Sequence, residues 1–527
     1  MLWFLSIVVI ILLVVRRWKI QKFVKVSKEL KCGIKSYQLI GHAHLLAGGG
    51  VNRMTVIKKI THDALKNGGL SYLWIGSKFY VGSVDAADVE VILKKCLEKD
   101  NILRFLRKLI GNGLIFPTVP IWRPRRKISA PTFSQANLNM FAKVFAEQSE
   151  SMVKQVKSTF GDGAEPLWKY MATFTFHSVC ETALGVKLKV NGNTEKQLME
   201  SFDIIFKLLM TRIVEPWLQL DALYKLLPQH SNFEKNKEII RSFVSEIIKE
   251  KRKKIKENIK TDNDDTKVTK SFLELYIESS GGDRGCTDEE LLEETLVMLL
   301  AGTDTSAVGL CFTICMLAQY PDVQEKVFQE LQEVFGDSER QVVVEDLPRL
   351  KYLEAVLRES LRLHPPVPVI VRAINDDIKL PSGVTLKKGC GFLALIWGLH
   401  RNPLYWGEDA EKFRPERFLE GHSRHPAAFL TFSHGPRNCL GYQYSMISLK
   451  IALATFLRTY RVLPRHDNSG SGEVDQEPMK LSYDIMMKDV DGFRESADIK
   501  EAVGKYQSVP YDIRVASPCV SCCGDEP

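Results

Sequence analysis

A single cysteine, Cys439, lies in a stretch whose residue types suit a metal ligand. Two glycines flank it, Gly435 and Gly441, and Arg437 precedes it by two positions. A thiolate is stabilised by a nearby cation and by backbone N–H groups, which a glycine-containing loop can turn toward one atom. A helix beginning at Tyr442 would add the positive end of its dipole. We therefore predict that Cys439 is the thiolate ligand of a haem iron, a ligand that favours cleavage of the O–O bond.

The alternative for Cys439 is a buried structural cysteine, the usual fate of a free thiol. His434 and His400 could ligate haem in a different protein, but the thiolate pattern disfavours that assignment. The eleven cysteines of the chain show no even framework spacing. Their distribution favours a reducing compartment over a disulfide scaffold.

Asp304 and Thr305 form a second chemical pair in the middle of an apolar segment. A buried acid is costly unless it has a task or a partner. Ala301 and Gly302 are small enough to let a flat macrocycle and dioxygen approach, so Thr305 could donate to dioxygen and Asp304 could relay protons. The alternative is a threonine that bonds back to a carbonyl one turn earlier. The pair alone does not decide between the two.

Haem also carries two propionates, which bind cations or N–H donors. The candidates are one indole and three guanidiniums: Trp122, Arg126, Arg372 and Arg437. Three further cations beside Arg126 leave the partner in that cluster open: Arg123, Arg125 and Lys127.

Glu359 and Arg362 lie three residues apart, so they share one face of a helix and can meet. An isolated pair of this kind is more often an exposed pair of little energetic value. Arg417 lies downstream in an arginine-rich stretch. We predict that the three form a structural triad, with a buried carboxylate between two guanidiniums, that fixes the loops behind the haem.

These motifs together resemble the cytochrome P450 family. The stretch Phe432-x-x-Gly435-x-Arg437-x-Cys439-x-Gly441 is similar to the haem-binding signature of the family, a highly specific pattern. Four further motifs match: Trp122-x-x-x-Arg126, Ala301-Gly-Thr-Asp-Thr-Ser306, Glu359-Ser-Leu-Arg362 and Phe413-Arg-Pro-Glu-Arg417-Phe418. The resemblance covers about residues 30 to 495 and is closest to the microsomal family-four clan, including insect members.

The resemblance implies a mainly α fold with small β-sheets and one haem domain over residues 51–495. It also implies haem b, with Phe432, Gly441, Ala301 and Gly302 as further cofactor contacts, and O₂ as co-substrate. Electrons would come from NADPH through a separate reductase, with cytochrome b5 as a further partner, since the chain has no Gly-rich dinucleotide fingerprint. Many family-four enzymes link haem covalently through a glutamate where this chain has Ala301, so non-covalent haem is expected.

Two other functions stay open: a haem-thiolate isomerase or peroxygenase that needs no reductase, and a non-catalytic haem or lipid carrier. The Asp304–Thr305 pair argues against both, because neither needs proton delivery to dioxygen. The apolar stretches 101–117 and 201–217 are predicted as pocket walls, carrying Phe105, Leu109, Leu114, Ile115, Phe116, Phe206, Leu208, Leu209 and Met210. A lipophilic substrate fits: a fatty acid, terpenoid hormone, pheromone, plant toxin or insecticide.

The elements that position these residues follow from caps and periodicity. Strands are predicted at 71–76 and 78–82, and helices from Asp85, over about 287–320, 321–335, 350–363 and 442–457, with long amphipathic segments between 135 and 260. The helix at 287–320 begins with a capping box and is nearly all apolar in its middle, which places it inside the protein. Its flanking charges and Asp304 make it a poor membrane span.

The termini carry a separate signal. The first fifteen residues have no charge, and Arg16, Arg17 and Lys19 follow. Cations after the apolar run predict an uncleaved signal-anchor over 1–20 in the endoplasmic reticulum membrane, with the body in the cytosol; a cleaved signal peptide is the alternative. Residues 21–50 are predicted as a linker and 496–527 as a polar tail with Cys519, Cys522 and Cys523.

The positive charge of the chain has several explanations. The net charge of +8 fits an anionic membrane or an acidic partner as well as nucleic acid. The basic run 249–260 has no aromatic residues to stack bases, so we interpret it as a solvated helix end and expect no nucleic-acid partner.

Overall fold

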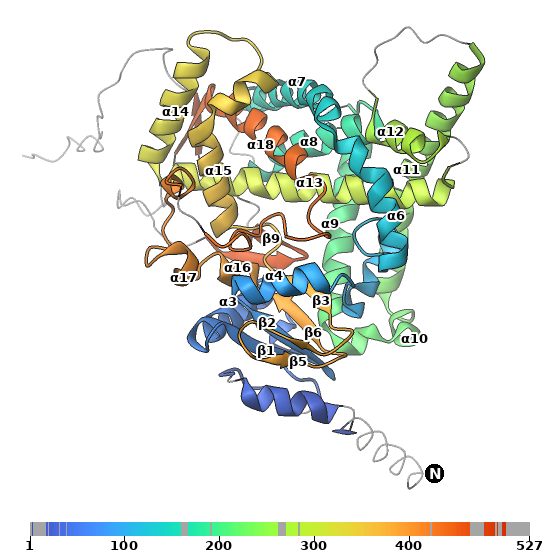
Figure 1. Ribbon diagram of the computed structural model, residues 1–527. Coiled ribbons are helices and arrows are strands. Elements are labelled where there is room, and N and C mark those ends of the chain that lie inside the picture. Colours follow the sequence, from blue (N-terminus) through green and yellow to red (C-terminus); the bar gives the residue numbers. More distant parts are fainter. Residues whose placement is uncertain are drawn as a thin grey trace, which may run out of the picture.

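The computed structural model is mainly helical, as predicted, and its main sheet lies at one end of the molecule (Figure 1). It describes residues 20–30, 32–37, 39–159, 167–189, 192–261, 270–282, 285–421, 424–463, 479–490 and 498–501, together with Trp3, Arg17, Trp18 and Phe493. Most of the predicted signal-anchor and of the predicted polar tail, including its three cysteines, lies outside the described residues.

Helix α13 (Asp288–Gln319) runs through the centre of the molecule. Thr287 caps it: its side chain accepts from the Glu290 N–H, and the Glu290 carboxylate accepts from the Thr287 N–H, which forms the predicted capping box. It is the one described helix long and apolar enough to cross a membrane, but 78% of its most apolar window is buried inside the protein. The sequence prediction of a core helix is therefore confirmed.

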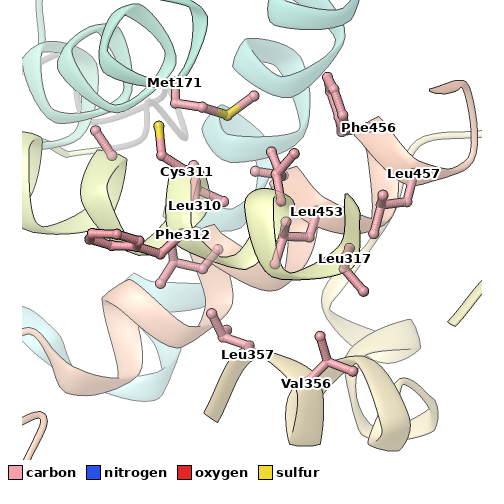
Figure 2. Close-up of a cluster of buried hydrophobic side chains, with 14 of the residues drawn as sticks. Met171, Leu310, Cys311, Phe312, Leu317, Val356, Leu357, Leu453, Phe456 and Leu457 are labelled. Carbon is pink, nitrogen blue, oxygen red and sulfur yellow. The ribbon is translucent and has the colours of Figure 1, made fainter. Parts of the chain in front are cut away.

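The helices that pack most extensively on α13 are α8 (Leu167–Val179), α11 (Pro228–Thr261), α15 (Lys351–Leu363) and α18 (Tyr442–Leu457). Figure 2 shows part of this core, where Leu310 and Phe312 of α13 lie among Met171 of α8, Leu357 of α15 and Leu453 of α18. Burial of such a side chain contributes about 1.5–3 kcal/mol to the free energy of folding. This cluster therefore fixes the position of α13 relative to α18.

The main sheet has four strands in the order β1-β2-β6-β3. They are β1 (Leu70–Ile75), β2 (Lys78–Ser83), β6 (Gly391–Ala394) and β3 (Ile370–Ala373). β2 pairs parallel with β6, and the other two pairs are antiparallel. Helix α4 (Ala86–Lys95) follows β2, and the Asp85 side chain caps it by accepting from the Asp88 N–H, as the sequence predicted.

The remaining elements complete the body. The other helices are α2 (Ala43–Leu46), α3 (Gly50–Lys66), α5 (Arg107–Ile110), α6 (Val119–Ser129), α7 (Gln135–Thr159), α9 (Asn193–Val214), α10 (Asp221–Tyr224), α12 (Phe272–Ser279), α14 (Pro321–Phe335), α16 (Ile396–Leu399) and α17 (Pro403–Trp406). The other strands are β4 (Ile378–Lys379), β5 (Thr385–Leu386), β7 (Tyr460–Leu463), β8 (Leu481–Asp484), β9 (Met486–Asp489) and β10 (Asp498–Glu501).

Two stretches outside the predicted haem domain make contacts with it. Within the predicted linker, Phe23, Val26 and Leu30 are buried in a cluster with residues of the main sheet. His42 is also fully buried, and its ring accepts the Trp74 N–H at 2.9 Å. At the other end, residues 498–501 of the predicted tail form β10, which pairs antiparallel with β7. The described part of 21–50 therefore packs on the body, and residues 498–501 of the predicted tail lie in a strand.

Candidate active site

A cavity of about 460 Å³ lies beside the middle of α13. The structure brings nine predicted site residues to its lining: Trp122, Arg126, Ala301, Gly302, Thr305, Phe432, Arg437, Cys439 and Gly441. The other five predicted residues do not line it: Asp304, Arg372, Glu359, Arg362 and Arg417. The cysteine loop and the core helix α13 therefore both border this cavity.

The cysteine loop is closed by its own backbone. The Cys439 N–H donates to the Phe432 carbonyl at 2.9 Å, and the Asn438 N–H donates to the Gly435 carbonyl at 3.0 Å. Gly435 has φ +72°, and a Cβ there would lie 2.8 Å from the Leu93 carbonyl oxygen, so only glycine fits. Because α18 begins at Tyr442, directly after the loop, the predicted loop-to-helix arrangement is present.

The Cys439 side chain is exposed to the cavity, and opposing effects act on its charge. Burial raises the pKa of the thiol, while the Gly441 N–H and the Arg126 charge oppose that rise. Arg126 is itself held by Asn438, to which it donates through Nη1 to the backbone oxygen (3.1 Å) and through Nη2 to Oδ1 (2.7 Å). A coordinated metal ion would favour the thiolate, because a ligating thiol is deprotonated.

Two buried arginines have N–H donors without partners in the residues that the structure describes: Arg437, which lines the cavity, and Arg372, which does not. Arg437 donates through Nη2 to the Pro117 carbonyl (2.7 Å) and stacks on the Trp122 ring at 4.3 Å, but its Nε and Nη1 have no partner among the described residues. Arg372 donates through Nη1 to its neighbour Val371, and its Nε and Nη2 also lack a partner in the described part of the chain. These buried donors fit the two carboxylates of a haem.

Lys99 is a third cation of this group, and the sequence reasoning missed it. It lines the cavity, and burial, followed by the charges of Arg372 and Arg437, lowers its pKa well below the usual value. Burial likewise lowers the pKa of Arg437 to about 10, and Arg372 adds to the effect. The charges of Arg372 and Arg437 oppose that of Lys99, and Arg372 opposes that of Arg437, so this group of cations predicts an anionic partner. One local sign in the sequence indicates that Lys99 belongs to the site, namely its position next to the apolar stretch 101–117.

Thr305 lines the cavity, but its hydroxyl donates to the Ala301 carbonyl at 2.6 Å. The back-bonded threonine, which the sequence left as an alternative, is therefore the arrangement present. The packing of α13 also explains why residue 302 is a glycine: a Cβ there would lie 2.7 Å from Val179 Cγ2. Gly302 thus permits the close contact between α13 and α8.

Asp304 is buried beside the cavity and has a partner that the sequence reasoning missed. Its Oδ2 lies 3.1 Å from Lys488 Nζ, and the same ammonium lies 3.3 Å from Asp203 Oδ1, which is half-exposed. Burial raises the pKa of Asp304, and the charge of Lys488 opposes the rise. Lys488 lies in the short apolar stretch of β9, where a lysine is unusual; that was the available signal.

The predicted triad has the expected geometry. Arg362 binds Glu359 through Nε and Nη2, both at 2.7 Å, and Arg417 Nε reaches Glu359 Oε1 at 3.0 Å. All three side chains are buried. His400 links the triad to the segment before the cysteine loop: its Nε2 accepts the Leu430 N–H at 2.8 Å, so Nδ1 carries the proton that it donates to the Arg362 carbonyl at 2.9 Å.

The histidines and the other cations near the loop have partners elsewhere. Burial lowers the pKa of His400 to about 3, so the ring is neutral, and His434 lies 3.3 Å from Glu90; neither ring lines the cavity. Of the neighbours of Arg126, Arg125 binds Glu293 of α13 at 2.7 Å.

The predicted pocket walls are correct in part. Five of the nine predicted apolar residues line the cavity: Leu109, Leu114, Ile115, Phe116 and Phe206. Four lie outside the lining: Phe105, Leu208, Leu209 and Met210. Two further walls, which no local pattern indicated, come from the β3 region and the β8–β9 turn: Val367, Val369, Ile370, Val371, Tyr483, Ile485 and Met486. The cavity away from the cations is therefore apolar.

One cavity thus holds a cysteine on a closed loop, donors for two carboxylates and an apolar wall, the combination that a haem-thiolate enzyme needs.

Comparison with known proteins gives the same class. The family model of cytochrome P450 matches residues 35–483. The chain is 31% identical over 466 residues to cytochrome P450 4V2 of Homo sapiens, covering 86% of this chain and 88% of that protein. It is 30% identical over 436 residues to cytochrome P450 4d2 of Drosophila melanogaster (80% and 86%) and 30% identical over 461 residues to cytochrome P450 4c21 of Blattella germanica (85% and 91%).

The chain belongs to the cytochrome P450 family, with relatives among its family-four members. It is therefore an oxidoreductase: a haem-thiolate monooxygenase that uses dioxygen.

Proposed function

We propose that the protein inserts one oxygen atom of O₂ into a lipophilic substrate at a haem b that Cys439 ligates. The observation that carries the proposal is the single cavity in which the Cys439 thiol, the Thr305 side chain and an apolar wall meet. Fatty acids, terpenoid hormones, pheromones and lipophilic xenobiotics suit such a wall.

Each cofactor contact has its own support. Arg437 and Arg372 would bind the propionates, because each has buried N–H donors without a hydrogen-bond partner among the described residues, and Lys99 would add a cation beside them. The Trp122 ring would keep Arg437 in place, and Arg126 would lower the cost of a negative sulfur. The haem would be bound without a covalent link, since Ala301 has no carboxylate. When bound, the haem supplies an iron that activates dioxygen, and a thiolate ligand favours cleavage of the O–O bond.

Four further residues would shape the cofactor pocket: Phe432, Gly441, Ala301 and Gly302. The Phe432 ring packs edge-on against Tyr442, with centroids 4.5 Å apart, which orients it at the cavity wall. Ala301 and Gly302 leave the middle of α13 without bulk where it borders the cavity.

Protons would reach the cavity from the surface through charged side chains. Asp203 is half-exposed, Lys488 bridges it to Asp304, and Asp304 precedes Thr305 in the chain. The Thr305 Oγ1 proton, now donated to the Ala301 carbonyl, can turn toward the cavity by rotation about the Cβ–Oγ1 bond. Asp304 would then return a proton toward this site, as a general acid does.

The electrons and the location of the protein are further proposals. NADPH would deliver electrons through a cytochrome P450 reductase, with cytochrome b5 as a second donor, docking on exposed lysines and arginines on the cysteine side. The order of apolar residues and cations in 1–20 supports a signal-anchor in the endoplasmic reticulum membrane, with the catalytic domain facing the cytosol.

The test is the spectrum of the reduced protein with carbon monoxide, the band for which the family is named. The wild type and the control Cys96→Ser should show the thiolate band, because Cys96 does not line the cavity. Cys439→Ser should lose it. A wild-type protein without this band would refute the ligand assignment.

A second measurement separates the competing functions. NADPH consumption that yields product with a reductase supports the monooxygenase. Turnover of peroxides without NADPH would support the isomerase or peroxygenase, and a Thr305→Ala variant with unchanged function would support a carrier.

A further inference from the structure

The loop of residues 111–116 forms one wall of the cavity and lies directly on α13. It supplies Leu114, Ile115 and Phe116 to the lining. A Cβ at Gly113 would lie 2.5 Å from the Glu293 carbonyl oxygen, so the loop backbone touches the helix. The position of this wall therefore depends on what holds the loop to α13.

Two buried acids of α13 hold the loop through its backbone. Glu293 Oε1 accepts the Asn112 N–H at 2.7 Å, and Glu294 Oε2 accepts the Leu114 N–H at 3.2 Å. Both side chains are buried. Buried carboxylates that accept backbone N–H groups are strong and directional anchors.

One guanidinium completes the arrangement. Arg125 Nη1 donates to Glu293 Oε2 (2.7 Å), Glu294 Oε1 (3.3 Å) and the Asn112 carbonyl (2.7 Å). Arg125 lies on α6, which also carries Trp122 and Arg126. A single side chain thus ties α6, the loop and α13 together.

We propose that Arg125, Glu293 and Glu294 are positioning residues that fix the wall of Leu114, Ile115 and Phe116, and thereby limit the length of substrate that the cavity accepts. We call these three residues the loop clasp. The inference rests on the proposed function, because the wall matters only if the substrate occupies this cavity.

The loop clasp contains two acids, Glu293 and Glu294, but one cation, Arg125, and this imbalance makes it sensitive to pH. The charged and titratable groups around Glu294 are Arg125 of α6, Glu290 and Glu293 of α13, and Tyr276 of α12. Burial raises the pKa of Glu294 to about 7, although Arg125 opposes the rise.

The sign of the pH effect follows from proton linkage. An acid whose pKa is raised in the closed loop binds its proton more tightly there than in an open loop. The closed loop is therefore favoured at low pH, loses stability as the pH rises from about 4.5 to about 7, and changes little above that.

Two variants separate the parts of the clasp. Glu293→Gln removes the closest partner of Arg125 and should loosen the loop at every pH. Glu294→Gln resembles the protonated acid and should keep the loop closed while removing its pH dependence. The matched control is Glu330→Gln, since Glu330 also accepts two backbone N–H groups, from Tyr352 and Leu353, but does not line the cavity.

The probes are hydrogen exchange of the peptide spanning 111–116, corrected for intrinsic rates, and spectral titration with 1-alkylimidazoles of increasing chain length. The imidazole ring binds the iron, so the tail measures the distance to the wall. We expect Glu293→Gln to speed exchange about tenfold, roughly the loss of one charged hydrogen bond, and to admit longer tails. In the wild type, exchange should quicken and longer tails should bind as the pH rises toward about 7.

The proposal is overturned if Glu293→Gln matches Glu330→Gln in both measurements, or if Glu294→Gln keeps the wild-type pH dependence. Failure of the proposed function has a different signature. It removes the carbon monoxide band of the wild type, whereas hydrogen exchange still reports on the clasp.

Discussion

Replacing Glu359 by glutamine removes the negative charge between two buried guanidiniums and keeps the shape of the side chain. Breaking a buried ion pair by removing one partner costs about 3–5 kcal/mol, because the other charge stays buried. Arg362 keeps three carbonyl acceptors, and Arg417 keeps Asp409 at 2.9 Å and backbone carbonyls. These remaining partners place the loss at the lower end, about 3 kcal/mol. This loss is a large fraction of the free energy of unfolding of a typical domain, about 5–15 kcal/mol.

The assay is denaturant unfolding of the holoprotein, followed by backbone circular dichroism and by the haem absorbance. Glu354→Gln is the matched control on the same helix, since Glu354 is one-third exposed and pairs with Arg358 and Lys450. It should lose less than Glu359→Gln, because Arg358 is about one-third exposed and Lys450 keeps the Leu347 carbonyl as an acceptor. If Glu359→Gln lost as little as this control, the triad would not brace the fold. If it lost stability without weakening the haem signal, the link to the cysteine loop would be wrong.

Further predictions concern the other parts of the site. Lys488→Met should leave Asp304 buried without its cation and lower the product formed per NADPH about tenfold, with substrate affinity unchanged. If the variant formed as much product per NADPH as the wild type, a proton relay through Lys488 would be excluded. Gly435→Ala should destabilise the protein by more than the about 1–2 kcal/mol of left-handed strain, because its Cβ also clashes. Gly421→Ala, at φ +64° with open space, should show the strain alone, so equal losses would deny the clash. Lys99→Met should weaken haem retention, measured by haem transfer, but stabilise the apoprotein against unfolding, because it removes a repelling charge. A variant in which haem retention and apoprotein stability both rose, or both fell, would contradict a propionate site.

Local signals were sufficient for the elements that position the site. The capping box at Thr287 and the proline after Tyr320 gave the bounds of α13 within a residue. The spacing of Glu359 and Arg362 predicted a pair that the structure contains. These signals depend on neighbours within one helical turn, which is why the sequence reveals them.

Contacts between distant parts of the chain were not predictable in the same way. Lys488 meets Asp304, and Glu294 meets Leu114, only because tertiary packing brings β9 and the 111–116 loop to α13. The packing of side chains within the predicted linker also depends on such contacts, and its glycine and polar residues give no local sign of it. The burial of His42 depends on its bond to the Trp74 N–H, which lies 32 residues away.

The backbone bonds inside the cysteine loop have a kinetic consequence. Cys439, Asn438 and Gly435 hold their places through hydrogen bonds to the backbone of the loop itself. His400, neutral at any ordinary pH, connects Leu430 to the triad and limits how far the loop can drift. Little conformational entropy is then lost when haem arrives. The rate of haem uptake should accordingly depend on the width of the path into the cavity, and mutations that widen that path should accelerate loading.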